Sequence, residues 1–305
     1  LSALGPGTVP TMAIMMVFTM ALAAELGITP VLLSALIVLG ASGGGVSPLA
    51  ATGIIGIKLC ADFGLHDIGQ QFLLNGMLSS TVYAVIIYIA LGGYKLESHL
   101  TMTTNAHISF DKKQLITLAG IGVMVLLVLL FKFNVGLVSF AVAAVLSFLR
   151  VSDESKALKQ VPWGTLLLIT GVGVLMQLII DLGGIKMLAA ALISIMSEKT
   201  ATAIMGITSG IMSWFSSTSG VVMPTLIPTI PHIVSEFPGV SKLELATAIT
   251  MISNTAGISP LSTGGALALA AYSSAANAGQ KEQQELFVKM FAISATGVLV
   301  LSVLS

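Results

Sequence analysis

Long apolar runs alternate with short polar segments along most of the chain. Five runs have the length of membrane-spanning helices, which need about 20 mostly apolar residues. These runs are residues 72–91, 114–131, 135–149, 163–180 and 286–304. A shorter apolar run, residues 8–24, follows a Gly-Pro-Gly sequence, and residues 185–197 predict a short interfacial helix. The pattern predicts an all-α polytopic membrane protein.

Three pairs of short apolar runs are interrupted by small polar residues. Residues 29–39 and 54–63 flank "GASGGGVSPLAATG", and residues 243–252 and 266–276 flank "SNTAGISPLSTGG". We expect each of these pairs to form a broken helix, with non-helical backbone at residues 42–48 and 254–260. Residues 200–215 and 221–235 flank "SSTSG" and are each too short to span a bilayer comfortably. They predict a re-entrant hairpin over residues 200–235 with its turn at residues 216–220.

The composition agrees with a membrane protein and excludes several other classes. The chain is 55% hydrophobic and 9% charged, whereas soluble domains carry about 25% charged residues. Basic and acidic residues number 13 each, which gives no indication of a nucleic-acid partner. The single Cys60 excludes a disulfide within the chain, and no His/Cys cluster has the spacing of a transition-metal site. We expect no cofactor other than a coupling ion, Na⁺ or H⁺.

The two broken stretches are copies of one another. Residues 45–53 read "GVSPLAATG" and residues 257–265 read "GISPLSTGG", so five of nine positions are identical at an offset of 212. Upstream, "GTVPT" at residues 7–11 resembles "GVVMPT" at residues 220–225, with one residue inserted. The same order in both places indicates an internal repeat, of the kind found with inverted topology in secondary transporters.

The repeat also predicts the organisation of the chain. Residues 1–93 are expected to be the C-terminal part of the first repeat, comprising half a hairpin, a broken helix and a span. Residues 94–113 form a cytoplasmic linker, and residues 114–305 form the second, inverted repeat, with its hairpin at 200–235, broken helix at 243–276 and last span. By the same offset the first copy would begin about 100 residues before Leu1, so its N-terminal part is expected to be missing.

Broken helices at membrane depth have a chemical use. Every backbone N–H and C=O in hydrocarbon must be satisfied internally, so unwound backbone is tolerated only inside protein or beside a water-filled cavity. Half-helix N-termini carry partial positive charge and can hold a carboxylate, while freed carbonyls can coordinate a cation. Neither break nor the hairpin turn contains Asp, Glu, Lys or Arg. This favours an anionic substrate held by N–H groups and hydroxyls. The alternative interpretation is that these small residues only allow close helix packing.

At these residues the chain resembles a known group of transporters. "LSALGPGTVPT" and "GASGGGVSPLAATGIIG" are similar to the N-terminal region of the malonate/dicarboxylate carrier family, and "VPWGTLLLITGVGVL", "FSSTSGVVMPTLIP" and "SNTAGISPLSTGG" to its C-terminal region. That family belongs to the ion-transporter superfamily, with the divalent anion/sodium symporters. The resemblance implies scaffold and transport domains, a homodimer, an elevator-like motion, and two hairpin tips that bind sodium and a carboxylate.

In the divalent anion/sodium symporters the two hairpin tips carry Ser-Asn-Thr. Ser216-Ser217-Thr218 would be the second tip, with Ser in place of Asn, whereas "SALGPG" at residues 2–7 lacks both Asn and Thr. Ser253-Asn254-Thr255 has the same letters but falls in the second unwound helix. The groups expected at the carboxylate are those of Ser47, Thr52, Ser217, Thr218, Ser219, Ser259, Ser262 and Thr263. The groups expected at the cation are those of Gly5, Gly7, Thr8, Ser42, Gly43, Gly44, Ser216, Thr218, Asn254 and Gly257.

The sequence therefore predicts a non-enzymatic permease for small carboxylates such as malonate or C4-dicarboxylates, located in the cell membrane, as in a bacterial inner membrane. Two alternatives stay open. A cation antiporter on the same fold would be expected to bury a carboxylate near the membrane centre. An intramembrane serine protease would use Ser42 of "GASG", but it needs a His on another membrane helix. His66, His99 and His107 fall in polar connections, and His232 follows a proline.

Overall fold

The computed structural model describes residues 1–26, 28–95, 111–131, 133–151, 153–160, 163–276 and 278–305. The described residues form helices and turns, with no strand among them. They divide into two compact units, one made of residues 1–99 and 168–305 and the other of residues 100–167. Each unit is described by itself. Most of the predicted linker at 94–113 lies outside the described residues.

The smaller unit is built on a helical hairpin. Helix α5 (Lys112–Phe131) packs against α6 (Val135–Phe148), in agreement with the two runs predicted at 114–131 and 135–149. Asn134 caps α6, because its side chain accepts the N–H of Leu137 at 3.2 Å. The short helix α7 (Glu154–Gln160) follows, and then α8 (Trp163–Asp181), whose first residues belong to this unit.

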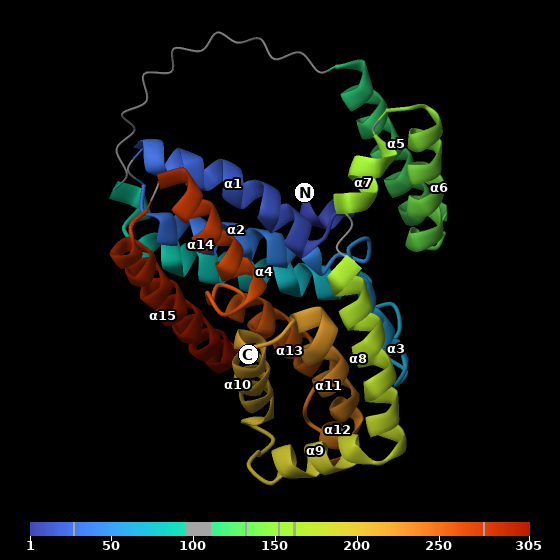
Figure 1. Cartoon of the computed structure of the whole chain (residues 1–305). Coiled ribbons are helices and arrows are strands. Elements are labelled where there is room, and N and C mark those ends of the chain that lie inside the picture. The colour runs from blue at the N-terminus through green and yellow to red at the C-terminus, as the bar shows by residue number, and fades with distance from the viewer. Residues whose placement is uncertain (27, 96–110, 132, 152, 161–162, 277) are drawn as a thin grey trace. The chain divides into compact units, whose positions relative to one another are not determined.

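In the larger unit, two described helices are long and apolar enough to cross a bilayer. They are α4 (Gly69–Ala90), with 22 residues, and α15 (Gln280–Leu304), with 25 residues. Both match predicted spans. Figure 1 shows α4 beside α2 (Pro30–Gly45), which in turn contacts α1 (Thr8–Leu26). The turn before α1 contains a short 3-10 helix, η1 (Ser2–Leu4).

The predicted hairpin at 200–235 is present, and its first and last residues lie at the same end of the two arms. Its first arm is α10 (Ala201–Trp214), and its second arm is a π-helical turn η3 (Thr218–Val222) followed by α11 (Met223–Leu226), η4 (Ile227–Thr229) and α12 (Ile230–Glu236). Helix α9 (Gly184–Ile193) contacts α12 at the open end of the hairpin. There Gly239, just after the second arm, lies against the side chain of Glu198, just before the first. The non-helical turn is at residues 215–217, slightly earlier than predicted.

The π-helical turn explains the inserted residue in the second copy of the Pro-Thr element. One extra residue in a helix is accommodated as a π-type turn, and the turn over Thr218–Val222 lies directly before Met223 and Pro224. The first copy, without the insertion, simply begins α1 at Thr8. The inserted residue in the second copy therefore changes only the local winding of the helix.

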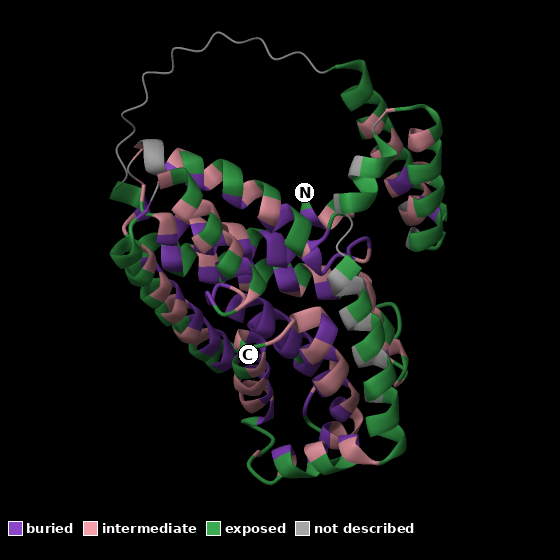
Figure 2. Ribbon diagram, in the orientation of Figure 1, coloured by how far each residue is buried: buried purple, intermediate pink, exposed green. Residues whose placement is uncertain are grey.

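Helix α13 (Lys242–Ala256) forms the centre of the larger unit. It packs against α10, α15, α2 and α4, and all residues from 245 to 256 are buried (Figure 2). Beyond it lies α14 (Thr263–Ala276), which packs against α1. The chain thus buries an unusually polar helix, and this arrangement places its C-terminal end in the interior.

The helix breaks are shorter than predicted and begin later. Helix α2 continues through Ser42 to Gly45, and the first break is residues 46–50, before α3 (Ala51–Ala61). Helix α13 continues through Asn254 to Ala256, and the second break is residues 257–262. The expected non-helical backbone at residues 42–45 and 254–256 is therefore wrong. Gly44 and Gly45 stay helical because they pack directly against Ser2 and Thr8, which offsets the roughly 1 kcal/mol that each glycine costs in a helix.

Candidate functional site

The first break is a tight turn held by its own serine. Ser47 N–H bonds the carbonyl of Gly44 at 3.0 Å, and Ala50 N–H bonds the carbonyl of Ser47 at 2.9 Å. The Ser47 hydroxyl oxygen accepts the N–H of Leu49 at 3.2 Å. A serine at the start of a turn commonly bonds a backbone N–H two residues on. The break is therefore locally satisfied, as buried backbone must be.

The second break repeats these three hydrogen bonds at the offset of 212. Ser259 N–H bonds the carbonyl of Ala256 at 2.9 Å, and Ser262 N–H bonds the carbonyl of Ser259 at 2.9 Å. The Ser259 hydroxyl oxygen accepts the N–H of Leu261 at 3.2 Å. The sequence repeat is thus accompanied by the same local fold.

One glycine in each break allows the next half-helix to begin close to the turn. A Cβ on Gly53 would overlap the carbonyls of Val46 and Ser47, and a Cβ on Gly265 would overlap those of Ile258 and Ser259. Only glycine lacks that atom, so the backbone can approach closely at these positions. This accounts for the identical glycine at the end of both sequence copies.

The hairpin tip is tied to the end of α13 by hydroxyl groups. Ser213 donates a hydrogen bond to the carbonyl of Ser253 at 2.7 Å, and its hydroxyl oxygen lies 3.0 Å from that of Thr218. Ser217 accepts the N–H of Gly220 at 3.1 Å and so caps the π-helical turn. These bonds fix the tip beside the second break.

The second break, the helix ends that flank the first break, the start of α1 and the hairpin tip meet at one small cavity of about 60 Å³, which we call the central cavity. None of its described lining residues is charged. The lining is Thr8, Val9, Met12, Val38, Ser42, Thr52, Ser217, Thr218, Ser219, Asn254, Gly257, Ser262, Thr263 and Gly264. Hydroxyls and one amide therefore supply the side-chain polarity of the cavity.

Helix ends converge on the central cavity. Thr8 and Thr263 are the first residues of α1 and α14, and Thr52 is the second residue of α3. Ser42 and Asn254 lie in the last turns of α2 and α13. Three helix N-termini favour negative charge in the cavity, and two helix C-termini favour positive charge beside it. The helix ends therefore give the cavity a potential that favours negative charge near some of its residues and positive charge near others.

Three buried polar side-chain atoms of the cavity have no hydrogen-bond partner among the described residues. They are the hydroxyls of Thr8 and Ser42 and Nδ2 of Asn254. Leaving a buried donor or acceptor unsatisfied costs about 1–3 kcal/mol, so such groups in a native fold require an explanation. Ser42 and Asn254 are also equivalent positions at the offset of 212. The two copies thus present unsatisfied polar groups to the same space.

The structure brings together ten of the residues expected at the site. Six from the carboxylate set and five from the cation set line the central cavity, with Thr218 in both: Thr52, Ser217, Thr218, Ser219, Ser262 and Thr263, and Thr8, Ser42, Thr218, Asn254 and Gly257. The other expected residues lie elsewhere. Ser47 and Ser259 cap the breaks internally, and Ser216 bonds the carbonyl of Met212. Gly5, Gly7, Gly43 and Gly44 do not line the cavity.

Sequence reasoning missed four lining residues. Val9 follows Thr8, Met12 lies one helical turn after Thr8, and Val38 lies one turn before Ser42. Met12 and Val38 are each four residues from a predicted site residue on the same helix, so they could have been predicted from helical spacing. Gly264 is the repeat equivalent of Thr52, so the offset would have found it. The described lining contains no His, so no imidazole beside Ser42 supports the protease alternative.

Comparison with known proteins agrees with a transporter. A family model described as citrate transporter (CitMHS) matches residues 1–252 of the 305-residue chain. No curated protein matches the chain. The family is part of the ion-transporter superfamily and consists of secondary transporters of citrate-like carboxylates, which are multi-pass membrane proteins and permeases rather than enzymes. Because this match covers most of the chain, the protein belongs to the citrate transporter (CitMHS) family, and the helical architecture of the described residues agrees with it.

Proposed function

We propose that this protein is an ion-coupled secondary transporter that binds a small di- or tricarboxylate in the central cavity. The substrates we consider are citrate, malonate and C4-dicarboxylates. The observation that carries the proposal is the convergence of three helix N-termini on a cavity with unsatisfied polar groups and no charged residue in its described lining. Oriented N–H groups of this kind bind anions without a basic side chain.

Individual residues suit different parts of the bound ions. Thr52, Thr218 and Thr263 each combine a hydroxyl with an N-terminal position, so we assign them to carboxylate oxygens. Ser42 lies at a helix C-terminus, where a hydroxyl oxygen and free carbonyls suit Na⁺. Asn254 was expected at the cation, but its unpartnered atom is the donor Nδ2. We therefore assign Asn254 to the carboxylate.

A second cavity offers a route for the anion to the central one. It has a volume of about 500 Å³ and shares Ser219 with the central cavity. Lys58 and Asp62 of α3 line it together with Pro224, Pro228 and Pro231 of the second hairpin arm. Lys58 is the described cation nearest in the chain to the first break, but the exposed Asp62 in the same lining offsets its charge, so the support for this route is the shared Ser219.

The central cavity must widen for transport. Its volume of about 60 Å³ is well below the roughly 300–1,000 Å³ of typical small-molecule sites. We propose that the central cavity opens when the hairpin tip moves relative to the two breaks. We also propose that the two repeats have inverted topology and that the transport domain moves across the membrane as an elevator. A homodimeric assembly and a bacterial inner membrane belong to the same proposal.

Uptake into proteoliposomes tests the proposal. Labelled citrate, malonate and succinate are supplied with an inward Na⁺ gradient, an inward H⁺ gradient or neither. We expect saturable uptake of at least one of these acids and its stimulation by one gradient. Thr218→Ala is expected to reduce uptake about tenfold or more, because a lost hydrogen bond to a charged group is worth roughly 1.5–3 kcal/mol. Equal uptake by wild type and Thr218→Ala, with equal membrane insertion, would show that the hairpin tip is not part of the binding site.

A further inference from the structure

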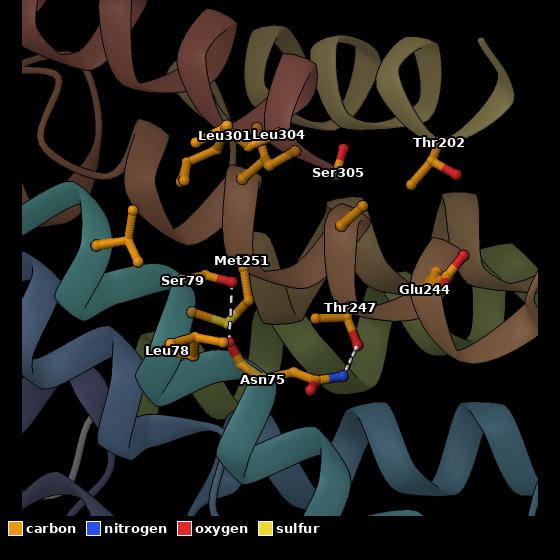
Figure 3. Close-up of a pocket in the computed structure, with 13 residues that line it drawn as sticks. Asn75, Leu78, Ser79, Thr202, Glu244, Thr247, Met251, Leu301, Leu304 and Ser305 are labelled. Carbon is orange, nitrogen blue, oxygen red and sulfur yellow. Dashed lines mark hydrogen bonds between the residues drawn. The ribbon is translucent and has the colours of Figure 1, made fainter. Parts of the chain in front are cut away.

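A groove on the surface of the larger unit has a polar end and an apolar end. It has a volume of about 490 Å³ and runs between the two spanning helices α4 and α15, with α13 and α10 behind it. Figure 3 shows Glu244 and Thr202 at one end, and Leu78 and Leu301 toward the other. Volumes of about 300–1,000 Å³ are typical of small-molecule sites. None of the groove residues lines the central cavity.

The exposed side chains beside the groove indicate its surroundings. Leu78 of α4 is 66% exposed and Leu304 of α15 is 64% exposed. Large apolar side chains on spanning helices face lipid, because hydrocarbon is the solvent there. A polar stripe in such a place is costly unless it is covered or bonded. The floor of this groove nevertheless carries Asn75 and Thr247, whose side chains are joined by a long hydrogen bond of 3.5 Å.

The order of groups along α13 matches that along a phospholipid. Glu244, Thr247 and Met251 all line the groove. Thr247 lies three residues, or about 4.5 Å, beyond Glu244, and Met251 lies seven residues, or about 10.5 Å, beyond it. A carboxylate is thus followed by a hydroxyl and then by apolar surface. A headgroup amine, an ester carbonyl and an acyl chain occur in the same sequence in a lipid.

The polar end has complementary charge for a zwitterion. Among the described residues, the Glu244 carboxylate takes part in no ion pair, and the neighbouring Lys242 ammonium lies over the ring of Phe63 at 5.8 Å instead. Thr202 is the second residue of α10, a 14-residue helix whose N-terminus has no side-chain cap. The N–H of Ala201 bonds the carbonyl of Ser197 at 2.9 Å, so the N–H groups that favour a phosphate are those of the next two residues, Thr202 and Ala203, while Glu244 favours an ammonium group.

We propose that this groove binds one phospholipid with a primary-amine headgroup, of the phosphatidylethanolamine type. Its ammonium group bonds Glu244, its phosphate lies at the N-terminus of α10, and an ester carbonyl accepts a hydrogen bond from Asn75 or Thr247. One acyl chain lies along Leu78 and Leu301. A primary ammonium donates charge-assisted hydrogen bonds to a carboxylate, whereas the quaternary ammonium of phosphatidylcholine has no N–H to donate. This lipid site is independent of the function proposed for the central cavity.

Native mass spectrometry of the chain in detergent tests the site. The protein is incubated with equal amounts of phosphatidylethanolamine, phosphatidylcholine and phosphatidylglycerol of identical acyl chains. We expect phosphatidylethanolamine to be retained about fivefold over phosphatidylcholine, the upper value for a partly exposed ion pair. Glu244→Gln should bring that ratio to about one. Leu78→Trp, which fills the apolar end, should reduce retention of every lipid.

The matched control is Glu285→Gln on α15, which removes a carboxylate paired with Lys289 away from the groove and should leave the ratio unchanged. Free ethanolamine at millimolar concentration should not displace the lipid, because most of the binding area is apolar. The proposal is overturned if Glu244→Gln keeps the fivefold preference, if phosphatidylglycerol is retained best, if Leu78→Trp retains as much lipid as wild type, or if ethanolamine alone displaces the lipid. Cross-linking of Leu78→Cys to a second chain would likewise assign the groove to a protein contact.

Discussion

The two helix breaks share their local geometry, while the helices around them do not. Ser47 and Ser259 make the same three hydrogen bonds at equivalent positions, with closely similar lengths. Gly53 and Gly265 make the same close approach to the turn. Around the breaks, the helix before the second one, α13, is buried at every residue from 245 to 256, whereas α2 exposes Gly40, the equivalent of the buried Ile252.

The arms beside the breaks differ as well. Helix α1 runs unbroken for 19 residues, whereas the second arm of the hairpin is divided into four short helical pieces. Pro224, Pro228 and Pro231 account for this division, because proline removes a backbone donor and clashes with the preceding turn. The features kept in both copies therefore build the central cavity, and the features that differ decide how each copy packs on its neighbours.

The largest expected effect comes from adding one methyl group to a break. Gly53→Ala and Gly265→Ala each place a Cβ against backbone carbonyls that cannot move aside. We expect each to cost about 3 kcal/mol of unfolding free energy, at the upper end for overpacking, which lowers Tm by roughly 6 °C for a unit of this size. Thermal unfolding in detergent measures the shift.

The matched control for these glycines is Gly40→Ala, whose added Cβ meets no atom within 4 Å. It should leave Tm unchanged or raise it slightly, because alanine is the better helix former. Strongly unequal effects of Gly53→Ala and Gly265→Ala would break the equivalence of the two breaks.

The unsatisfied cavity groups should affect binding more than stability. Ser42→Ala and Asn254→Ala each remove a polar atom that has no partner among the described residues. We expect about tenfold or larger losses in affinity for the carboxylate or for the coupling ion, with Tm unchanged within about 2 °C. Ser80→Ala is the control, because its hydroxyl is also buried and unpartnered in the described part of the chain but lies outside the central cavity. A loss of affinity in Ser80→Ala equal to that in Ser42→Ala would show that cavity position does not matter.

The serines inside the breaks should show the reverse pattern and the smallest effect. Ser47→Ala and Ser259→Ala each lose a hydroxyl that accepts a backbone N–H. Each should cost about 1 kcal/mol, or roughly 2 °C in Tm, and the two values should agree. Calorimetry or thermal unfolding measures them. If the variants keep their stability but lose carboxylate binding, these serines belong to the binding site, as predicted from the sequence alone.

The sequence was sufficient for the long helices, for the existence of two breaks and for the identity of the meeting segments, because apolar run length and the repeat determine these features, but it placed the start of each break three or four residues too early. It did not separate Ser47 from Ser42, since both are serines of one motif. Their roles differ because the break starts at residue 46. Ser47 therefore lies in the turn and bonds the backbone there, whereas Ser42 lies in helix α2. It also placed Gly44 in unwound backbone, because the cost of glycine in a helix is visible locally and its contact with Ser2 is not.

The central claim is that helix N-termini, without a basic residue, hold the carboxylate in the central cavity. Cryo-electron microscopy of the protein with saturating citrate, and with malonate as a second ligand, tests it most directly. The account predicts ligand density whose carboxylate oxygens lie about 2.7–3.2 Å from N–H or hydroxyl groups of Thr52, Thr218 and Thr263. Density that is absent from the central cavity and instead pairs with a Lys or Arg side chain would contradict it.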